Sequence, residues 1–403
     1  MIIEENMNKR LLSFLLLLTI FTSLLFTGCT PKLYKSRNFS IFDTYSELIG
    51  YETSAKKFDK ISNKIFSALS EYHKLFDIYN EYEGIPNLCT VNKLVDGEHP
   101  VVKVDRRIID MLLYAKEMHE LTGGKMNIAM GSVLSIWHDY RTKGIDEPWN
   151  AELPPMDLLQ AAAEHTNIDD LIIDEENSTV WLRDPQMKLD VGAFAKGYAV
   201  EMAARMLEDE GKSGYSISVG GNIRTVGYTA NGNKWAAGIE NPTLDDENPY
   251  IAYISLAGEA IVTSGSYQRY YVVVDSAECS SCEWVYDTEK GIPDQNINPG
   301  TQPSKLATDI KCPACESKIY KISNRYHHII DPDTLMPAQR GFLSVSIICN
   351  DSGMGDGLST ALFCMNLEDG MALINSLEGV EAMWVAKDET KYYSDGFDRF
   401  FTE

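Results

Sequence analysis

Four cysteines in two closely spaced pairs carry the clearest chemical signal in the chain. Cys279 and Cys282 form one C-x-x-C pair, and Cys312 and Cys315 form a second. Two such pairs can bring four thiolates to one tetrahedral centre, which suits zinc or iron. A pair of disulfides is the alternative in an oxidising compartment, although adjacent C-x-x-C pairs have poor geometry for internal bridges. The spacing therefore predicts a four-sulfur metal site.

A glycine-containing turn between a short extended segment and a helix is the second candidate. Asp190 ends the extended segment, and apolar residues with a period of 3.6 predict a helix over 195–210 that Gly211 ends. Free N–H groups at the start of a helix favour a phosphate, and Asp190 could accept from a ligand or bind a cation there. An ordinary glycine-rich corner is the alternative, since the segment is neither a GxGxxG motif nor a P-loop.

Two oxygen-bearing residues and one histidine near the C-terminus complete the set. Asp356 and Thr360 lie four residues apart in a helix expected over 355–367, so they share one face and can present two oxygens to a hard cation. A carboxylate that only stabilises a helix N-terminus is the alternative for Asp356. His328 is of a type suited to proton transfer near neutral pH, with a purely structural histidine as the alternative.

The charge balance narrows the classes of ligand. The 403 residues include 59 acidic and 36 basic side chains, a formal net charge of −23. Such a chain would repel nucleic acid and anionic membrane surfaces, so we expect no nucleic-acid partner. A ligand that carries phosphate would need a local cation, and a divalent metal ion is the obvious one.

The N-terminus has the pattern of a targeting segment. Lys9 and Arg10 precede a largely apolar run over 11–26, and Thr27-Gly28-Cys29 follows. This pattern resembles a bacterial lipoprotein signal, with residues 1–28 as the signal peptide, lipidation of Cys29 and a polar tether over 29–38. An uncleaved membrane anchor is the alternative. In either case we expect an extracytoplasmic protein that is attached to a membrane.

The expected elements must bring these residues together. Periodicity predicts a strand over 39–51, helices over 54–79 and 154–165, and a helix that Asp105 caps. Further strands are expected over 171–174, 179–183, 215–219, 235–239, 251–255, 260–263 and 343–349. Helices and strands are mixed without strict alternation, which favours an α+β fold over a doubly wound sheet.

The segment that contains the four cysteines resembles a rubredoxin along its length. The matching parts are Trp284 and Tyr286 after the first pair, the GIPD run at 291–294, the NPGT run at 298–301 and the CPxC pair. The resemblance implies a single iron that carries one electron. Three departures keep zinc as an alternative: Glu283 and Glu316 replace glycines, and Ile310 replaces a tryptophan. We expect residues 274–321 to be an insert in a main domain over 39–273 and 322–403.

Six motifs of the main domain occur together in one order: TGGKMN, LDVGAFAKGYAVE, SVGGNIRTVG, TSGSYQRYY, YHHIIDPDT and DGLSTALF. With the insert set aside, they resemble the ApbE family of flavin transferases, the FAD:protein FMN transferases, over roughly residues 40–400. The resemblance implies an α+β ApbE-like fold and an enzyme that binds FAD and Mg²⁺. It also implies transfer of FMN to a threonine hydroxyl of an acceptor protein, with release of AMP. An FAD pyrophosphatase that uses water as acceptor, or a redox protein that retains FAD, is the alternative.

The resemblance also implies roles for individual residues. His328 and Asp356 are the expected catalytic residues, with His328 assisting removal of the threonine proton. Mg²⁺ is expected at Asp356, Thr360 and the backbone carbonyl of Ala193. The positions expected to bind the flavin substrate are Tyr79, Lys125, Met126, Asn127, Asp190, Lys196, Ser264 and His328. Asn127 stands where the family usually has Asp, and Gly265 and Arg269 are expected to line the same pocket.

Overall fold

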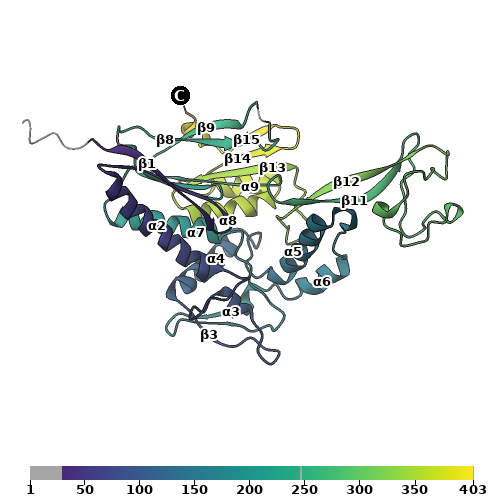
Figure 1. Cartoon of the computed structure of the whole chain (residues 1–403), viewed down its shortest axis with the longest axis horizontal. Helices are drawn as coiled ribbons and strands as arrows, with labels where there is room; N and C mark the ends of the chain where they lie inside the picture. Colours follow the sequence, from purple (N-terminus) through teal and green to yellow (C-terminus); the bar gives the residue numbers. More distant parts are fainter. Residues whose placement is uncertain (1–29, 246, 403) are drawn as a thin grey trace, which may run out of the picture.

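An antiparallel sheet of eight strands forms the body of the protein, in a computed structural model that describes residues 30–245 and 247–402 (Figure 1). Its strands are β1 (Lys32–Ile41), β2 (Thr44–Glu52), β6 (Tyr215–Val219), β7 (Asn222–Val226), β10 (Ala260–Gly265), β13 (Phe342–Cys349), β14 (Glu381–Ala386) and β15 (Lys391–Tyr393). They are hydrogen-bonded in the order β1-β2-β6-β7-β10-β13-β14-β15. Smaller sheets consist of β3 (Val102–Lys103), β5 (Thr179–Leu182) and β4 (Leu171–Asp174), of β8 (Trp235–Glu240) and β9 (Tyr250–Leu256), and of β11 (Tyr270–Cys279) and β12 (Ile319–His327).

Helices pack against this sheet and complete an α+β architecture, as expected. They are α2 (Ala55–Phe76), α3 (Leu88–Asn92), α4 (Arg106–Leu121), α5 (Gly131–Asp146), α6 (Met156–Ala163), α7 (Ala195–Asp209), α8 (Ser352–Phe363) and α9 (Leu367–Asn375). Helix α7 contacts β6 and β7, α8 contacts β10 and β13, and the two helices contact each other. The buried face of α7 carries small residues such as Ala195, Ala199 and Ala203, which allow this close approach. The start of each helix is therefore held firmly beside the other.

The strands β11 and β12 form an arm that extends from the body (Figure 1). Their register pairs Tyr271 with Tyr326 at the base and Cys279 with Ile319 at the far end. Beyond the far end the chain encloses a small core of its own, made of Ala277, Tyr286, Ile292, Ile297, Leu306 and Ile310. The insert expected over 274–321 thus has a hydrophobic core separate from those of the body.

The N-terminal part of the fold differs from the sequence-based expectation. The single strand expected over 39–51 is a hairpin, in which β1 and β2 are joined at Phe42 and Asp43. Both joining residues have positive φ, 52° and 49°, a conformation that the sequence pattern does not reveal. Residues 32–38, expected within a polar tether, belong to β1 and pair with β2 along its length.

Two further helical segments differ from expectation. The helix expected over 355–367 is α8, which begins earlier because Asp351 caps it by accepting from the N–H of Met354 at 2.9 Å. It ends at Phe363, and α9 follows as a separate helix. Helix α5 has no counterpart in the sequence analysis, which predicts no element over 131–146. Its few buried residues leave no continuous apolar face for a pattern to reveal.

The predicted signal peptide over 1–28 and the predicted lipidation site at Cys29 lie outside the described residues. Within the described residues, no helix has both the length and the apolar character needed to cross a membrane.

Candidate active site

One cavity of about 320 Å³ lies where the glycine turn before α7, the end of β10, the base of the arm and α8 meet. Every residue expected to bind the flavin or Mg²⁺ lines this cavity: Tyr79, Lys125, Met126, Asn127, Asp190, Ala193, Lys196, Ser264, His328, Asp356 and Thr360. Gly265 and Arg269 line it as well. Residues that are far apart in the sequence thus converge on one site, which we call the main cavity.

Asp356 is fixed in the main cavity by the contact between α7 and α8. The N–H of Gly197 donates to Asp356 Oδ2 at 2.8 Å, and Lys196 Nζ lies 3.7 Å from the same oxygen. The close approach requires glycine, because a Cβ at position 197 would lie 2.3 Å from the carbonyl oxygen of Ser352. Both interactions use Oδ2 and hold the carboxylate at the cavity.

The carbonyl group of Ala193 lies just before α7, and its oxygen accepts no backbone hydrogen bond among the described residues. The N–H of Gly197 is one of the first donors of the helix, which have no acceptor within the helix, and Asp356 supplies that acceptor. Thr360 lies one helical turn after Asp356, and its Oγ1 is 3.5 Å from Ser264 Oγ. A carbonyl, a carboxylate and a hydroxyl oxygen are ligands that a hard divalent cation prefers. The residues present therefore fit a magnesium ion.

Asp190 and Lys196 supply further charge in the main cavity. Asp190 Oδ1 accepts from the N–H of Gly192 at 2.8 Å, and Lys196 Nζ donates to the carbonyl of Gly192 at 3.1 Å. Burial raises the pKa of both Asp190 and Asp356, because desolvation disfavours the charged form. A cation or a cationic ligand group in the cavity would oppose this effect.

The adjacent histidines have different environments, and only His328 lines the main cavity. His327 Nδ1 accepts from the N–H of Ile329 at 3.3 Å, and its Nε2 donates to the carbonyl of Ala338 at 3.0 Å, which occupies both ring nitrogens. His328 Nδ1 lies 3.2 Å from the carbonyl oxygen of Arg269. A carbonyl can only accept, so Nδ1 of the neutral ring carries the hydrogen and Nε2 is left as a base. Burial lowers the pKa of His328 to about 3, which keeps the ring neutral.

The segment 125–127 faces the cavity, and contacts with the surrounding structure hold it in place. Lys125 Nζ lies 3.3 Å from Oδ1 of the buried Asp331 and forms a second ion pair with Asp333. Asn127 Nδ2 donates to the carbonyl of Thr166 at 3.0 Å, and its Oδ1 accepts from the N–H of Ala129. An aspartate could not make the bond to Thr166. This contact gives the departure from the family pattern at Asn127 a structural reason.

A cationic group of residues that the sequence analysis largely missed also lines the main cavity. Arg141 and His138 come from α5, and Arg269 precedes β11. Arg141 Nη2 donates to His138 Nδ1 at 3.2 Å, and the ring of Tyr79 lies 5.3 Å from that of His138. Only Arg269 could be foreseen, because it belongs to a recognisable motif; α5 carries no such motif.

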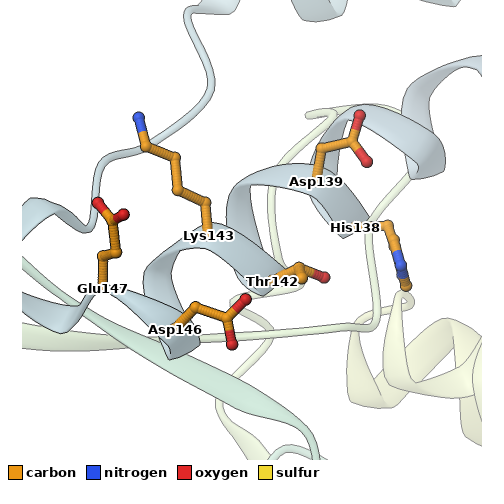
Figure 2. Close-up of a pocket in the computed structure, with 6 residues that line it drawn as sticks. All are labelled: His138, Asp139, Thr142, Lys143, Asp146 and Glu147. Atoms are coloured by element: carbon orange, nitrogen blue, oxygen red, sulfur yellow. The ribbon is translucent and has the colours of Figure 1, made fainter.

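A second hollow, of about 370 Å³, lies on the outer side of α5 (Figure 2). It is lined by His138, Asp139, Thr142, Lys143, Asp146 and Glu147, and all of these except His138 are exposed. In Figure 2 the side chains of Lys143 and Asp146 point in different directions and do not converge on a point. This hollow therefore lacks the converging polar groups that characterise the main cavity.

The four cysteines meet at the far end of the arm, as their spacing predicts. The sulfur of Cys279 lies 3.4 Å from that of Cys315, and the sulfur of Cys282 lies 3.7 Å from that of Cys312. These distances exceed the S–S bond of about 2.0 Å in a disulfide. A tetrahedron of thiolates with metal–sulfur bonds of about 2.3 Å has sulfur atoms roughly 3.8 Å apart. The four sulfurs therefore fit one metal ion.

The sheet, the paired helices α7 and α8 and the cavity between them place the protein in a class of α+β folds represented by solved structures of ApbE proteins. The ApbE protein of Thermotoga maritima is 24% identical, with a TM-score of 0.68, and the match covers 92% of this chain and all of that one. The flavin transferase ApbE of Vibrio cholerae is 20% identical, with a TM-score of 0.65 and the same coverage. The model of the ApbE family matches residues 42–298 and 315–384, and the chain belongs to this family.

Comparisons of sequence agree with this assignment. A protein named FAD:protein FMN transferase from Klebsiella pneumoniae (strain 342) is 26% identical over 330 residues, which cover 82% of this chain and 83% of that protein. One of the same name from Treponema pallidum (strain Nichols) is 27% identical over 313 residues, 74% of this chain and 71% of that protein. The rubredoxin model matches residues 276–321. Both resemblances expected from the sequence are thus confirmed.

Proposed function

We propose that this protein is a Mg²⁺-dependent FAD:protein FMN transferase that moves FMN from FAD to a threonine hydroxyl of an acceptor protein and releases AMP. The observation that carries the proposal is the convergence of Asp356, Ala193 and the neutral His328 on one cavity. Membership of the ApbE family and the names of the relatives support FAD as the substrate. The transferase class follows from the same comparisons.

The proposed reaction is a displacement at phosphorus. The threonine oxygen attacks the phosphorus on the FMN side of the FAD diphosphate, and an O–P bond forms. The bond from that phosphorus to the bridging oxygen breaks, and AMP leaves with the bridging oxygen and its electron pair. His328 Nε2 accepts the threonine proton, because its neutral ring has a free lone pair there. The base is thus available without prior loss of a proton.

The chain prepares this step by holding its polar groups in place. Gly197 fixes Asp356 through the bond to Oδ2, and Lys196 lies beside both Asp356 and the turn before α7. A Mg²⁺ ion held by Ala193, Asp356 and Thr360 would offset negative charge on the diphosphate. The Asn222 amide lies beside Asp356 and partly opposes the rise in the pKa of that carboxyl group.

The direct test is incubation of the protein with FAD, Mg²⁺ and a flavoprotein domain that carries an acceptor threonine, with intact mass as the readout. We expect the acceptor to gain the mass of FMN, and AMP to appear in equal amount. Asp356→Ala should abolish the mass gain while leaving absorption from the four-cysteine site unchanged. Wild-type protein that leaves the acceptor unmodified under these conditions would exclude the proposal.

The same experiment separates the alternative functions. An FAD pyrophosphatase would release free FMN and AMP whether or not the acceptor is present, since water would replace the threonine hydroxyl. A redox protein would retain intact FAD through the incubation with Mg²⁺. Quantifying FAD, FMN and AMP by chromatography distinguishes all three outcomes.

For the insert we propose a single iron bound by Cys279, Cys282, Cys312 and Cys315, which carries one electron. The family match and the sulfur distances support a metal at this place, and zinc is the alternative. The arm has nine steps of about 3.3 Å between its base and Cys279, so the iron would lie roughly 30 Å from the main cavity. Visible iron–thiolate absorption and metal analysis of the purified protein test the assignment. Zinc without such absorption would refute it.

For the location we propose an extracytoplasmic protein held to the bacterial cell membrane by a lipid on Cys29. The support is the pattern of the first 29 residues alone. Mass spectrometry of the N-terminal peptide from membranes tests the proposal, and Cys29→Ala should release the protein from the membrane fraction or leave the signal uncleaved. An unmodified Cys29 in wild-type protein would refute it.

A further inference from the structure

Charged groups of both signs line the main cavity. Asp190 and Asp356 are the carboxylates among them, and Asp356 belongs to the residues that fit a divalent cation. Arg141 and Arg269 line the same cavity beside His328. The chain has a net charge of −23, so two arginines that line one cavity are not expected from its composition alone.

The two arginines lack the partners that arginines have elsewhere in this protein. Arg224, for example, pairs with Glu201 at 2.9 Å, and Arg340 pairs with Asp331 at 2.6 Å. Among the described residues, neither Arg141 nor Arg269 forms an ion pair with a carboxylate within 4.0 Å, although the charge of Asp190 acts on Arg141 from a greater distance. The side-chain contact of Arg141 is with Nδ1 of His138, which must be unprotonated to accept.

The two guanidinium groups also act on each other and on His328. Burial and then the positive charge of Arg269 lower the pKa of Arg141, against an opposing effect of Asp190. Burial and then both arginines lower the pKa of His328, whose backbone N–H donates to the carbonyl of Arg269 at 3.1 Å. Two like charges in one partly buried site are unfavourable unless an anion lies between them. Asp190 lines the same cavity and offsets part of this repulsion at Arg141, yet the pKa of Arg141 stays lowered, which favours a further anionic group from a ligand.

We propose that Arg141 and Arg269 bind the phosphoryl group that is transferred, together with the residues that fit the metal ion in the same cavity. This inference rests on the proposed function and deepens it. Because the arginines border the base that deprotonates the nucleophile, the anion nearest to them is the phosphoryl group under attack. The acceptor threonine is neutral and would not need two guanidinium groups. In the reaction itself, the pair stabilises charge on the phosphoryl oxygens while the bond to AMP breaks.

A consequence for His328 follows from the same arrangement. A bound phosphoryl group would neutralise the two positive charges that oppose protonation of the ring. His328 would then become a stronger base when FAD arrives than it is in the free protein. Binding of the substrate would thus activate the group that deprotonates the second substrate.

The test compares binding of FMN with binding of riboflavin, which lacks the phosphate, by quenching of flavin fluorescence in the full chain. The variants are Arg141→Gln, Arg269→Gln and a matched control, Arg325→Gln. Arg325 lies on β12 near the base of the arm, stacks on Tyr270 with its guanidinium carbon 4.8 Å from the ring centre, and does not line the main cavity. We expect the preference for FMN over riboflavin to fall about tenfold in each of the first two variants and to persist in the control.

The transfer assay provides a second readout. Arg141→Gln and Arg269→Gln should lower kcat about 100-fold, and Arg→Lys at either position should restore part of it. An unchanged preference for FMN in both variants would overturn the proposal. A rise in KM for the acceptor protein, with no other change, would also overturn it, because the arginines would then bind an acidic group of the acceptor. If the wild-type chain transfers no FMN, the proposed function fails, but the comparison of FMN with riboflavin still decides the role of the arginines.

Discussion

Replacing Gly197 with alanine tests the contact between α7 and α8 that orders the proposed metal site. A Cβ at position 197 would lie 2.3 Å from the carbonyl oxygen of Ser352 and 2.5 Å from the Cβ of Asp356. Both atoms are fixed relative to the backbone of α8, so α7 and α8 must separate by about 1 Å before the new Cβ is at van der Waals distance from them. That shift would stretch the 2.8 Å bond from the Gly197 N–H to Asp356 Oδ2 beyond hydrogen-bonding range.

Three contributions set the expected loss of stability. Overpacking costs about 1–3 kcal/mol, and loss of a hydrogen bond to a charged group costs about 1.5–3 kcal/mol. The better helix propensity of alanine offsets about 1 kcal/mol. The net destabilisation is therefore about 1.5–5 kcal/mol, which at about 2 °C per kcal/mol lowers Tm by roughly 3–10 °C. Displacement of Asp356 should also raise the Mg²⁺ concentration needed for half-maximal FMN transfer.

Gly357→Ala is the matched control in the partner helix. A Cβ at position 357 would lie 2.9 Å from Met118 Cε, the far end of a flexible side chain that can move aside. We expect little change in Tm or in the Mg²⁺ requirement for this variant. Thermal melting and a Mg²⁺ titration of both variants complete the test. Gly197→Ala protein that melts with the wild type and needs no additional Mg²⁺ would refute the account of the site.

Three other perturbations address separate parts of the protein. His328→Ala should reduce FMN transfer about 100-fold or more without lowering Tm, whereas His327→Ala should lower Tm because two contacts to the backbone are lost; a transfer defect confined to His327→Ala would contradict the assignment. Burial raises the pKa of Asp190 and Asp356, so activity should fall as the pH drops through these raised values. A higher Mg²⁺ concentration should move this acid limb of the pH–activity profile to lower pH, because the metal ion competes with protons for the carboxylates. An acid limb that is insensitive to Mg²⁺ would count against both carboxylates. Cys282→Ser should remove iron–thiolate absorption and leave FMN transfer unchanged, as absorption spectra and intact mass would show.

Much of the site could be predicted because each motif fixes its residues locally. Asp356 and Thr360 share a helix face by their spacing, and Asp190 ends the segment before a glycine turn. The order of the motifs then indicated one site, and the structure brings these residues to one cavity. The insert was recognisable for the same reason, since the four cysteines and the residues between them form a continuous pattern.

What could not be predicted depends on contacts between distant segments. Arg141 reaches the cavity through the packing of α5, which has neither a clear apolar face nor a side-chain cap to mark it in the sequence. The position of Asp356 beside the start of α7 results from a hydrogen bond across 159 residues, between Gly197 and Asp356. The left-handed turn at Phe42 likewise has no glycine to indicate it.

The arm has a consequence for how this protein could have acquired its extra module. Adjacent strands lie about 4.8 Å apart, so any module whose two ends are that close can be joined to β11 and β12 without disturbing the body. The base of the arm is packed against its own cluster, which includes Trp137, Tyr271 and Tyr326. Loss of metal at the far end should therefore unfold the module alone, and related chains could exchange it for another domain while Arg269 and His328 keep their positions.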